Sequence, residues 1–150
     1  KWWSIGISII LTLFIGHYMW HIGGKNIAES SWNNTSTAMN HINENIQSSD
    51  VIISGEIYTY FHTSYYNRTN KEIILLKPKE ELGWVGEWGL IKKLNTPEIS
   101  SLESVKSPRI WLILREKTYD EYKKQVPPYW QLKQEFHDGD LIIGLYVNKL

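Results

Sequence analysis

The 150-residue sequence contains no cysteine, which excludes a disulfide framework, a thiolate nucleophile and a cysteine-ligated metal. It also lacks an excess of charge of either sign, because 16 Lys and Arg residues balance 16 Asp and Glu residues. We therefore expect no nucleic-acid partner. A hydrophobic content of 42% with 21% charged residues is typical of a globular domain and not of a disordered chain.

A phosphate-binding loop is the second thing that the sequence lacks. Asp50 is followed by the aliphatic run 51–53, which ends at Ser54-Gly55, and the aromatic segment 56–66 has the length of a helix. This pattern predicts a buried strand that leads into a helix, and ligands of α/β sheets usually bind at such a strand end. However, Gly55 stands without the further glycines and the lysine of a phosphate loop, and the window 73–76 holds no acidic residue. A nucleotide-binding Rossmann relative is thus the weakest of our functional hypotheses.

Charged residues are absent from position 2 to position 24. As a helix, residues 2–22 would be about 31 Å long, close to the thickness of a bilayer's hydrocarbon core. Aromatic residues stand at both ends of this segment, as they do at membrane interfaces. The pattern predicts a transmembrane helix over residues 1–24, with a signal peptide or a buried helix as alternatives. Lys1 and Lys25 flank the segment evenly, so the sequence does not determine its orientation.

The rest of the chain is predicted to be a linker (25–33) followed by an α/β domain (34–150). Apolar spacing indicates a helix within 34–47, and capping-box spacing from Thr118 to Glu121 indicates a helix over 118–125. Asp138-Gly139 is a common hairpin turn, which predicts paired strands over 130–137 and 140–148. With strands expected near 51–54, 72–76 and 109–114, the fold class is a small three-layer, Rossmann-like α/β domain with a C-terminal antiparallel hairpin.

No catalytic constellation is evident, because Ser54 lacks the G-x-S-x-G elbow and the local carboxylate pairs fit solvated or capping positions. We expect no catalytic residue, no metal ligand and no cofactor in this part of the protein. The candidate binding residues are side chains of the aromatic helix and of a glycine–tryptophan loop, namely Tyr58, His62, Tyr65, Tyr66, Trp84 and Trp88. The alternative for each of them is packing in the core or over the open side of the sheet.

The order of several segments carries a family resemblance. They are Ser49-Asp50-Val51-Ile52-Ile53, Tyr65-Tyr66-Asn67, the loop 83–89, Arg109-Ile110-Trp111-Leu112-Ile113 and Gly144-Leu145-Tyr146-Val147. Together with the apolar first segment, this order resembles the carboxy-terminal end of C-type polytopic membrane glycosyltransferases of the protein-mannosyltransferase and aminoarabinose-transferase-like superfamily. The resemblance covers nearly the whole chain.

The resemblance implies the last transmembrane helix and the extracytoplasmic domain of a cell-membrane enzyme that uses a polyprenyl-phosphate-linked sugar and a glycan or protein acceptor. It places the catalytic acidic residue and any divalent metal upstream of Lys1, so that this part is non-catalytic. We then expect further membrane spans upstream. The rival hypothesis is a single-span, membrane-anchored α/β module that binds a carbohydrate, a lipid headgroup or a protein partner.

Overall fold

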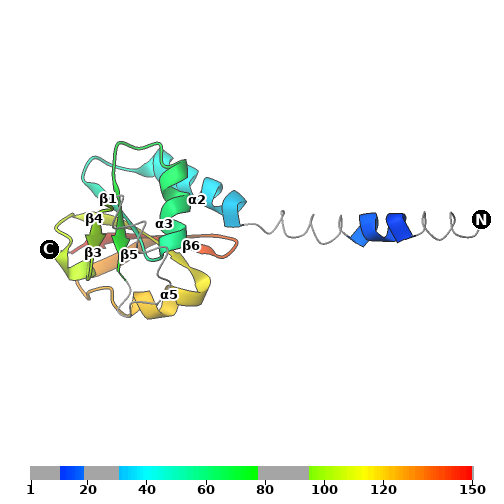
Figure 1. Cartoon of the computed structure of the whole chain (residues 1–150). Coiled ribbons are helices and arrows are strands. Elements are labelled where there is room, and N and C mark those ends of the chain that lie inside the picture. Colours follow the sequence, from blue (N-terminus) through cyan, green and yellow to red (C-terminus); the bar gives the residue numbers. More distant parts are fainter. Residues whose placement is uncertain (1–10, 19–30, 78–94, 150) are drawn as a thin grey trace, which may run out of the picture.

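The computed structural model describes residues 11–18, 31–77 and 95–149 (Figure 1). Residues 11–18 form a helix whose large apolar side chains, including Leu13 and Phe14, are exposed. Within the described ranges, no helix combines the length and the apolar composition that crossing a membrane requires. The transmembrane helix predicted over 1–24 is thus not among the helices found, and most of its residues lie outside the described ranges.

The core of the fold is a mixed six-stranded sheet in the order β3-β2-β1-β4-β6-β5. β3, β2, β1 and β4 run parallel, β6 is antiparallel to β4, and β5 is antiparallel to β6. The strands are β1 (Asp50–Ser54), β2 (Ile73–Leu76), β3 (Glu98–Ile99), β4 (Arg109–Arg115), β5 (Trp130–Asp138) and β6 (Leu141–Asn148). The predicted α/β class and the C-terminal hairpin at one edge of the sheet are confirmed.

Helices cover both faces of this sheet (Figure 1). α2 (Ser31–Asn45) and α3 (Ile57–Tyr66) contact each other and lie on one face, where Met39 and Ile42 pack with Trp111. α5 (Glu116–Lys123) and the short 3-10 helix η1 (Leu102–Ser104) lie on the other face, where Tyr122 joins Leu112 and Leu114. The central strands are therefore buried on both sides, which explains their nearly continuous apolar sequence.

The start of α5 differs from its predicted position. The capping-box spacing places the N-cap at Thr118, but the helix begins at Glu116, directly after β4, with Arg115 as its N-cap residue. Thr118 Oγ1 instead lies 2.9 Å from Glu56 Oε1 and 3.1 Å from the carbonyl oxygen of Arg115. The prediction was wrong because a partner 62 positions away in the sequence engages the hydroxyl group.

The hairpin turn is also shifted by one residue from its predicted position. Asp138 pairs with Leu141, so the two loop residues are Gly139 and Asp140 and not Asp138-Gly139. Gly139 has a φ of 58°, as required at the first loop position of a type II′ turn, where glycine is favoured. This shift leaves Asp140 outside the strand pairing and next to the end of β4.

Candidate functional site

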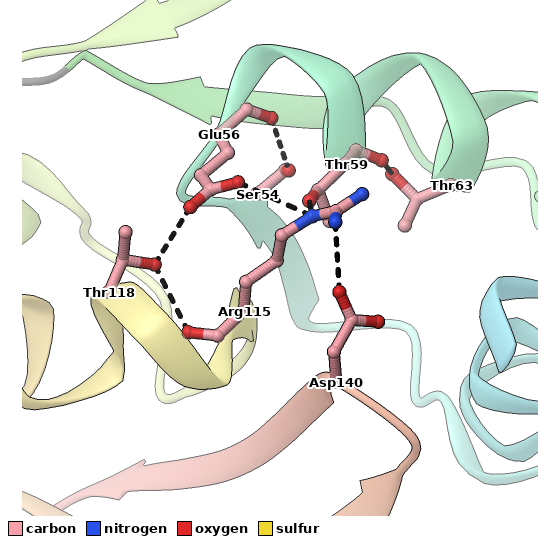
Figure 2. A network of polar contacts seen from close by, with 7 residues as sticks. All are labelled: Ser54, Glu56, Thr59, Thr63, Arg115, Thr118 and Asp140. Atoms are coloured by element: carbon pink, nitrogen blue, oxygen red, sulfur yellow. Dashed lines mark hydrogen bonds and ion pairs between the residues drawn. The ribbon is translucent and has the colours of Figure 1, made fainter. Parts of the chain in front are cut away.

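The candidate site lies where the carboxyl ends of the neighbouring parallel strands β1 and β4 meet. From β1 the chain moves to β2 and β3 on one side, whereas β4 lies on the other side of β1. This reversal is a topological switch point, and open α/β sheets form their ligand crevice outside the strand ends at such a point. The β1–α3 turn, the start of α5 and the β5–β6 turn all reach this edge (Figure 2).

Arg115, the last residue of β4, is the centre of a polar network at this edge (Figure 2). Its Nη1 donates a hydrogen bond of 2.8 Å to Asp140 Oδ2. Its Nε lies 3.4 Å from Glu56 Oε2 and 3.4 Å from Thr59 Oγ1. One guanidinium group thus joins the β1–α3 turn, the first turns of α3 and the β5–β6 turn.

The turn after β1 is fixed by contacts that leave the Glu56 carboxylate available for this network. Ser54 is buried, and its hydroxyl donates a 3.1 Å hydrogen bond to the carbonyl oxygen of Glu56. The Gly55 amide donates to the carbonyl oxygen of Ile113 at 3.0 Å. Glu56 is the N-cap residue of α3, but its side chain makes no capping hydrogen bond. Its carboxylate instead reaches across to Arg115 and Thr118.

The network carries an excess of negative charge, because two carboxylates share one guanidinium group. Glu116 adds a further carboxylate in the first turn of α5, and its amide donates to the carbonyl oxygen of Asp140 at 2.8 Å. Burial, and then the charges of Glu56 and Glu121, raise the pKa of Tyr122 to about 12. The edge therefore favours ligands that donate hydrogen bonds or carry positive charge, and disfavours phosphate groups.

His62 lies on α3 close enough to Arg115 to feel its charge. Burial, and then the positive charge of Arg115, lower the pKa of His62 below its ordinary value of 6.5. At neutral pH the imidazole is therefore uncharged and can donate or accept a hydrogen bond. Because the folded state disfavours the charged form, His62 contributes stability above pH 6.5, and this contribution is lost as the pH falls toward the lower, folded-state pKa.

We predict that an NMR titration of the full chain will show His62 with a pKa below 6.5. In Arg115→Met the pKa should rise but stay below the ordinary value, because burial is the larger cause of the shift. Lys106→Gln, which removes an exposed charge from another part of the chain, should leave the titration unchanged. A His62 pKa at or above 6.5 in the unaltered chain would contradict this assignment.

The structure places the predicted binding residues of α3 along the whole length of the helix. Tyr58, with 55% of its surface exposed, lies in the first turn, and His62 lies one turn later, near Arg115. Tyr65, which is 76% exposed, lies in the last turn, and Tyr66 packs against the core and forms an edge-on ring contact with Tyr65. Trp84 and Trp88 lie outside the described residues.

Sequence reasoning missed the polar residues of the network, namely Glu56, Thr59, Arg115, Thr118 and Asp140. One signal could have identified three of them: each of Glu56, Arg115 and Asp140 stands at the end of an apolar strand or in the turn beside one. Polar side chains at the carboxyl ends of parallel strands meet at one edge of a sheet. Within the described ranges, no three His, Cys, Asp or Glu side chains are grouped so that they could hold a metal ion.

Comparisons with known proteins give a fold likeness only. No protein-family model and no curated protein matches the chain. The 16S rRNA methylase RmtB has a similar structure, with a TM-score of 0.43 and 11% identity over 83% of this chain and 64% of that chain. An rRNA methylase from Escherichia coli gives a TM-score of 0.40 and 10% identity over 75% of this chain and 62% of that chain. This chain thus covers less than two thirds of either structure.

These findings correct the resemblance to membrane glycosyltransferases. The similar solved structures are named as rRNA methylases, no family model supports a glycosyltransferase, and no helix in the described part of the chain could cross a membrane. The expectations of a polyprenyl-phosphate sugar donor, a glycan acceptor and a membrane partner are withdrawn with it, as is the exclusion of nucleic acid. The resemblance was misleading because any α/β sheet with buried parallel strands supplies short aliphatic segments in a similar order.

Proposed function

We propose that this domain binds a nucleoside-type ligand that carries no phosphate group, at the carboxyl ends of β1 and β4. The observation that carries the proposal is the Glu56–Arg115–Asp140 network at the topological switch point of the sheet. The parallel order β3-β2-β1-β4 is that of a Rossmann-like sheet, in which the nucleoside of a cofactor lies outside the strand ends at this position.

Asp140 supplies an acceptor for a ribose hydroxyl. Its Oδ2 accepts a hydrogen bond from Arg115, whereas its Oδ1 is buried and has no hydrogen-bond partner among the described residues. A covered acceptor without a partner costs free energy that a hydrogen bond from a ligand would recover. The side chain of Asp140 is 42% exposed, so a small rotation of its carboxylate would present Oδ1 to a ligand.

Tyr58 supplies an exposed aromatic surface one helical turn before His62, on the same face of α3. It lies in the first turn of α3 and exposes 55% of its surface. Stacking of a nucleobase on an aromatic side chain contributes roughly 1–3 kcal/mol and depends little on which base is bound. The uncharged imidazole of His62 on the next turn can form a hydrogen bond with the base or the ribose.

The same site disfavours nucleotides that carry phosphates. The turn after β1 contains a single glycine, Gly55, and lacks the series of backbone amides with which a phosphate loop surrounds its ligand. The negative excess of the network would also repel a phosphate group. A nucleoside with a positively charged substituent should therefore bind more tightly than adenosine, and adenosine more tightly than its monophosphate.

Isothermal titration of the full chain with S-adenosylmethionine, adenosine and AMP tests this order. S-adenosylmethionine, which carries the positively charged substituent, should bind most tightly and AMP most weakly. Asp140→Asn should weaken adenosine binding about fivefold, because the acceptor of the ribose hydrogen bond loses its charge and a charge-assisted hydrogen bond is roughly twice as strong as a neutral one. Asp120→Asn, at an exposed position of α5, makes the same change outside the network and should have no effect. Equal losses in the two variants, or tightest binding of AMP, would contradict the proposal.

A further inference from the structure

A polar cavity lies near the amino ends of the parallel strands, whereas the candidate site lies at their carboxyl ends. It has a volume of about 320 Å³ and lies between the end of α2 and the turn that joins α3 to β2. The cavity is shallow and widely open to solvent, and its volume is at the lower end of the range of about 300 to 1,000 Å³ found for small-molecule sites. Two cationic side chains, Arg68 and Lys71, line it together with Ile46 and with amide and hydroxyl groups, and none of its lining residues in the described part of the chain carries a carboxylate.

Hydrogen bonds within the α3–β2 turn hold the wall of the cavity in place. Asn67 Nδ2 donates to the carbonyl oxygen of Lys71 at 2.8 Å, and Asn67 Oδ1 accepts from the Thr69 amide at 3.0 Å. The Lys71 amide in turn donates to Thr69 Oγ1 at 3.1 Å. A ligand would therefore meet a wall that is already formed, which reduces the conformational entropy lost on binding.

The turn is also attached to α2 and to the chain that follows α2. Asn43 Oδ1 accepts from the Arg68 amide at 3.2 Å, and Asn43 Nδ2 donates to the carbonyl oxygen of Tyr66 at 3.3 Å. The Lys71 ammonium group donates to the carbonyl oxygen of Ser48. The two sides of the cavity thus keep a fixed separation, and the positive charge of Lys71 is held between them.

The guanidinium group of Arg68 remains available to a ligand. Arg68 is exposed, and none of the ion pairs within the described ranges involves it. A guanidinium group presents a planar set of donors that matches two oxygens of a phosphate. With Lys71 beside it, the cavity has two positive charges to place opposite a dianion.

We infer that this cavity binds a small organic phosphate monoester. The side chains of Arg68 and Lys71 contact the phosphate, and the side-chain amide groups of Gln47 and Asn70 contact hydroxyl groups of the organic part. The site is separate from the one proposed above, since it lies at the amino ends of the parallel strands and its charge has the opposite sign. Each of the two proposals can therefore be tested without the other.

An NMR titration of the full chain with glycerol 1-phosphate, inorganic phosphate and glycerol tests the inference. Glycerol 1-phosphate should shift the amide signals of residues 43–48 and 67–71 in a saturable manner, and inorganic phosphate should do so more weakly. Glycerol alone should leave these signals in place. Shifts spread evenly over the surface, or no saturable binding of either phosphate, would overturn the inference.

Arg68→Gln should weaken binding of glycerol 1-phosphate about ten- to a hundredfold, because charge-assisted hydrogen bonds are lost. Arg68 is exposed, so this variant should keep the fold, which the unchanged amide spectrum of β1 and β4 would show. Lys106→Gln is the matched control, because Lys106 is an exposed cation near the start of β4, at the same edge of the sheet but outside the cavity. Equal losses in Arg68→Gln and Lys106→Gln would show non-specific attraction and overturn the inference, whereas adenosine binding should be unchanged in both.

Discussion

Asp50→Ala should lower the free energy of unfolding by roughly 3–5 kcal/mol, the usual cost of removing one partner from a buried ion pair. The side chain of Asp50 is fully buried. Its Oδ2 accepts a 2.9 Å hydrogen bond from the Trp111 indole and a 3.0 Å hydrogen bond from the Gln47 amide. Arg109 Nε lies 3.1 Å from Oδ1, as an ion pair without hydrogen-bond geometry.

Alanine would leave the buried indole N–H of Trp111 and the partly buried amide of Gln47 without an acceptor. It would also leave the guanidinium group of Arg109, whose side chain is only 18% exposed, without a counterion. Because a domain of this size is stable by about 5–15 kcal/mol, the variant should be close to unfolding. Urea denaturation followed by tryptophan fluorescence measures the loss. Asp50→Asn keeps one acceptor oxygen and should lose less, and Glu103→Ala at an exposed site should lose almost nothing. A loss below about 1 kcal/mol in Asp50→Ala would contradict this role.

Gly55→Ala should lower the free energy of unfolding by about 1–3 kcal/mol through overpacking. A Cβ atom at Gly55 would lie 2.3 Å from Leu114 Cδ2 and 3.5 Å from Tyr122 Cε2. Leu114 is 1% exposed and belongs to the core cluster with Tyr122, so it has little room to move. Gly55 is thus required for space between β1 and α5, and not for a phosphate loop.

A double-mutant cycle separates this steric effect from a change in the turn itself. In a Leu114→Ala background the alanine at Gly55 meets a shortened side chain, so Gly55→Ala should cost clearly less than it does alone. Thermal unfolding detects the difference, because about 1 kcal/mol corresponds to a shift of roughly 4 °C in Tm for a domain of this size. Equal costs in the two backgrounds would place the strain in the backbone of the turn and contradict the steric explanation.

Sequence reasoning predicted those elements whose signal is local. β1 and β4 are buried on both faces, so their sequences are nearly continuous apolar runs. Such a run predicts a buried strand even when the neighbouring strands are not known. The turn signal Asp138-Gly139 likewise predicted the hairpin, with an error of one residue in the position of the turn. The two-residue strand β3 and the three-residue η1 are too short to produce any periodicity.

The candidate site could not be predicted in the same way, because its contacts are made between distant positions. Arg115 and Asp140 are 25 residues apart, and Glu56 and Thr118 are 62 residues apart. These pairs meet only because β4 lies between β1 and β6. The sequence identified Tyr58 and His62 from their place on the helix after the first strand, but it could not indicate that Arg115 lowers the pKa of His62.

Binding of a nucleoside at this site is tested most directly by locating bound adenosine or S-adenosylmethionine on the full chain by NMR shift mapping and intermolecular NOEs. We predict NOEs between the nucleobase and the ring of Tyr58, with the largest amide shifts at Glu56, Arg115 and Asp140. These signals would place the ligand at the carboxyl ends of β1 and β4. Amide shifts confined to the amino ends of the strands, around Arg68, would contradict binding at this site. A saturable complex without any contact to Tyr58 would contradict it as well.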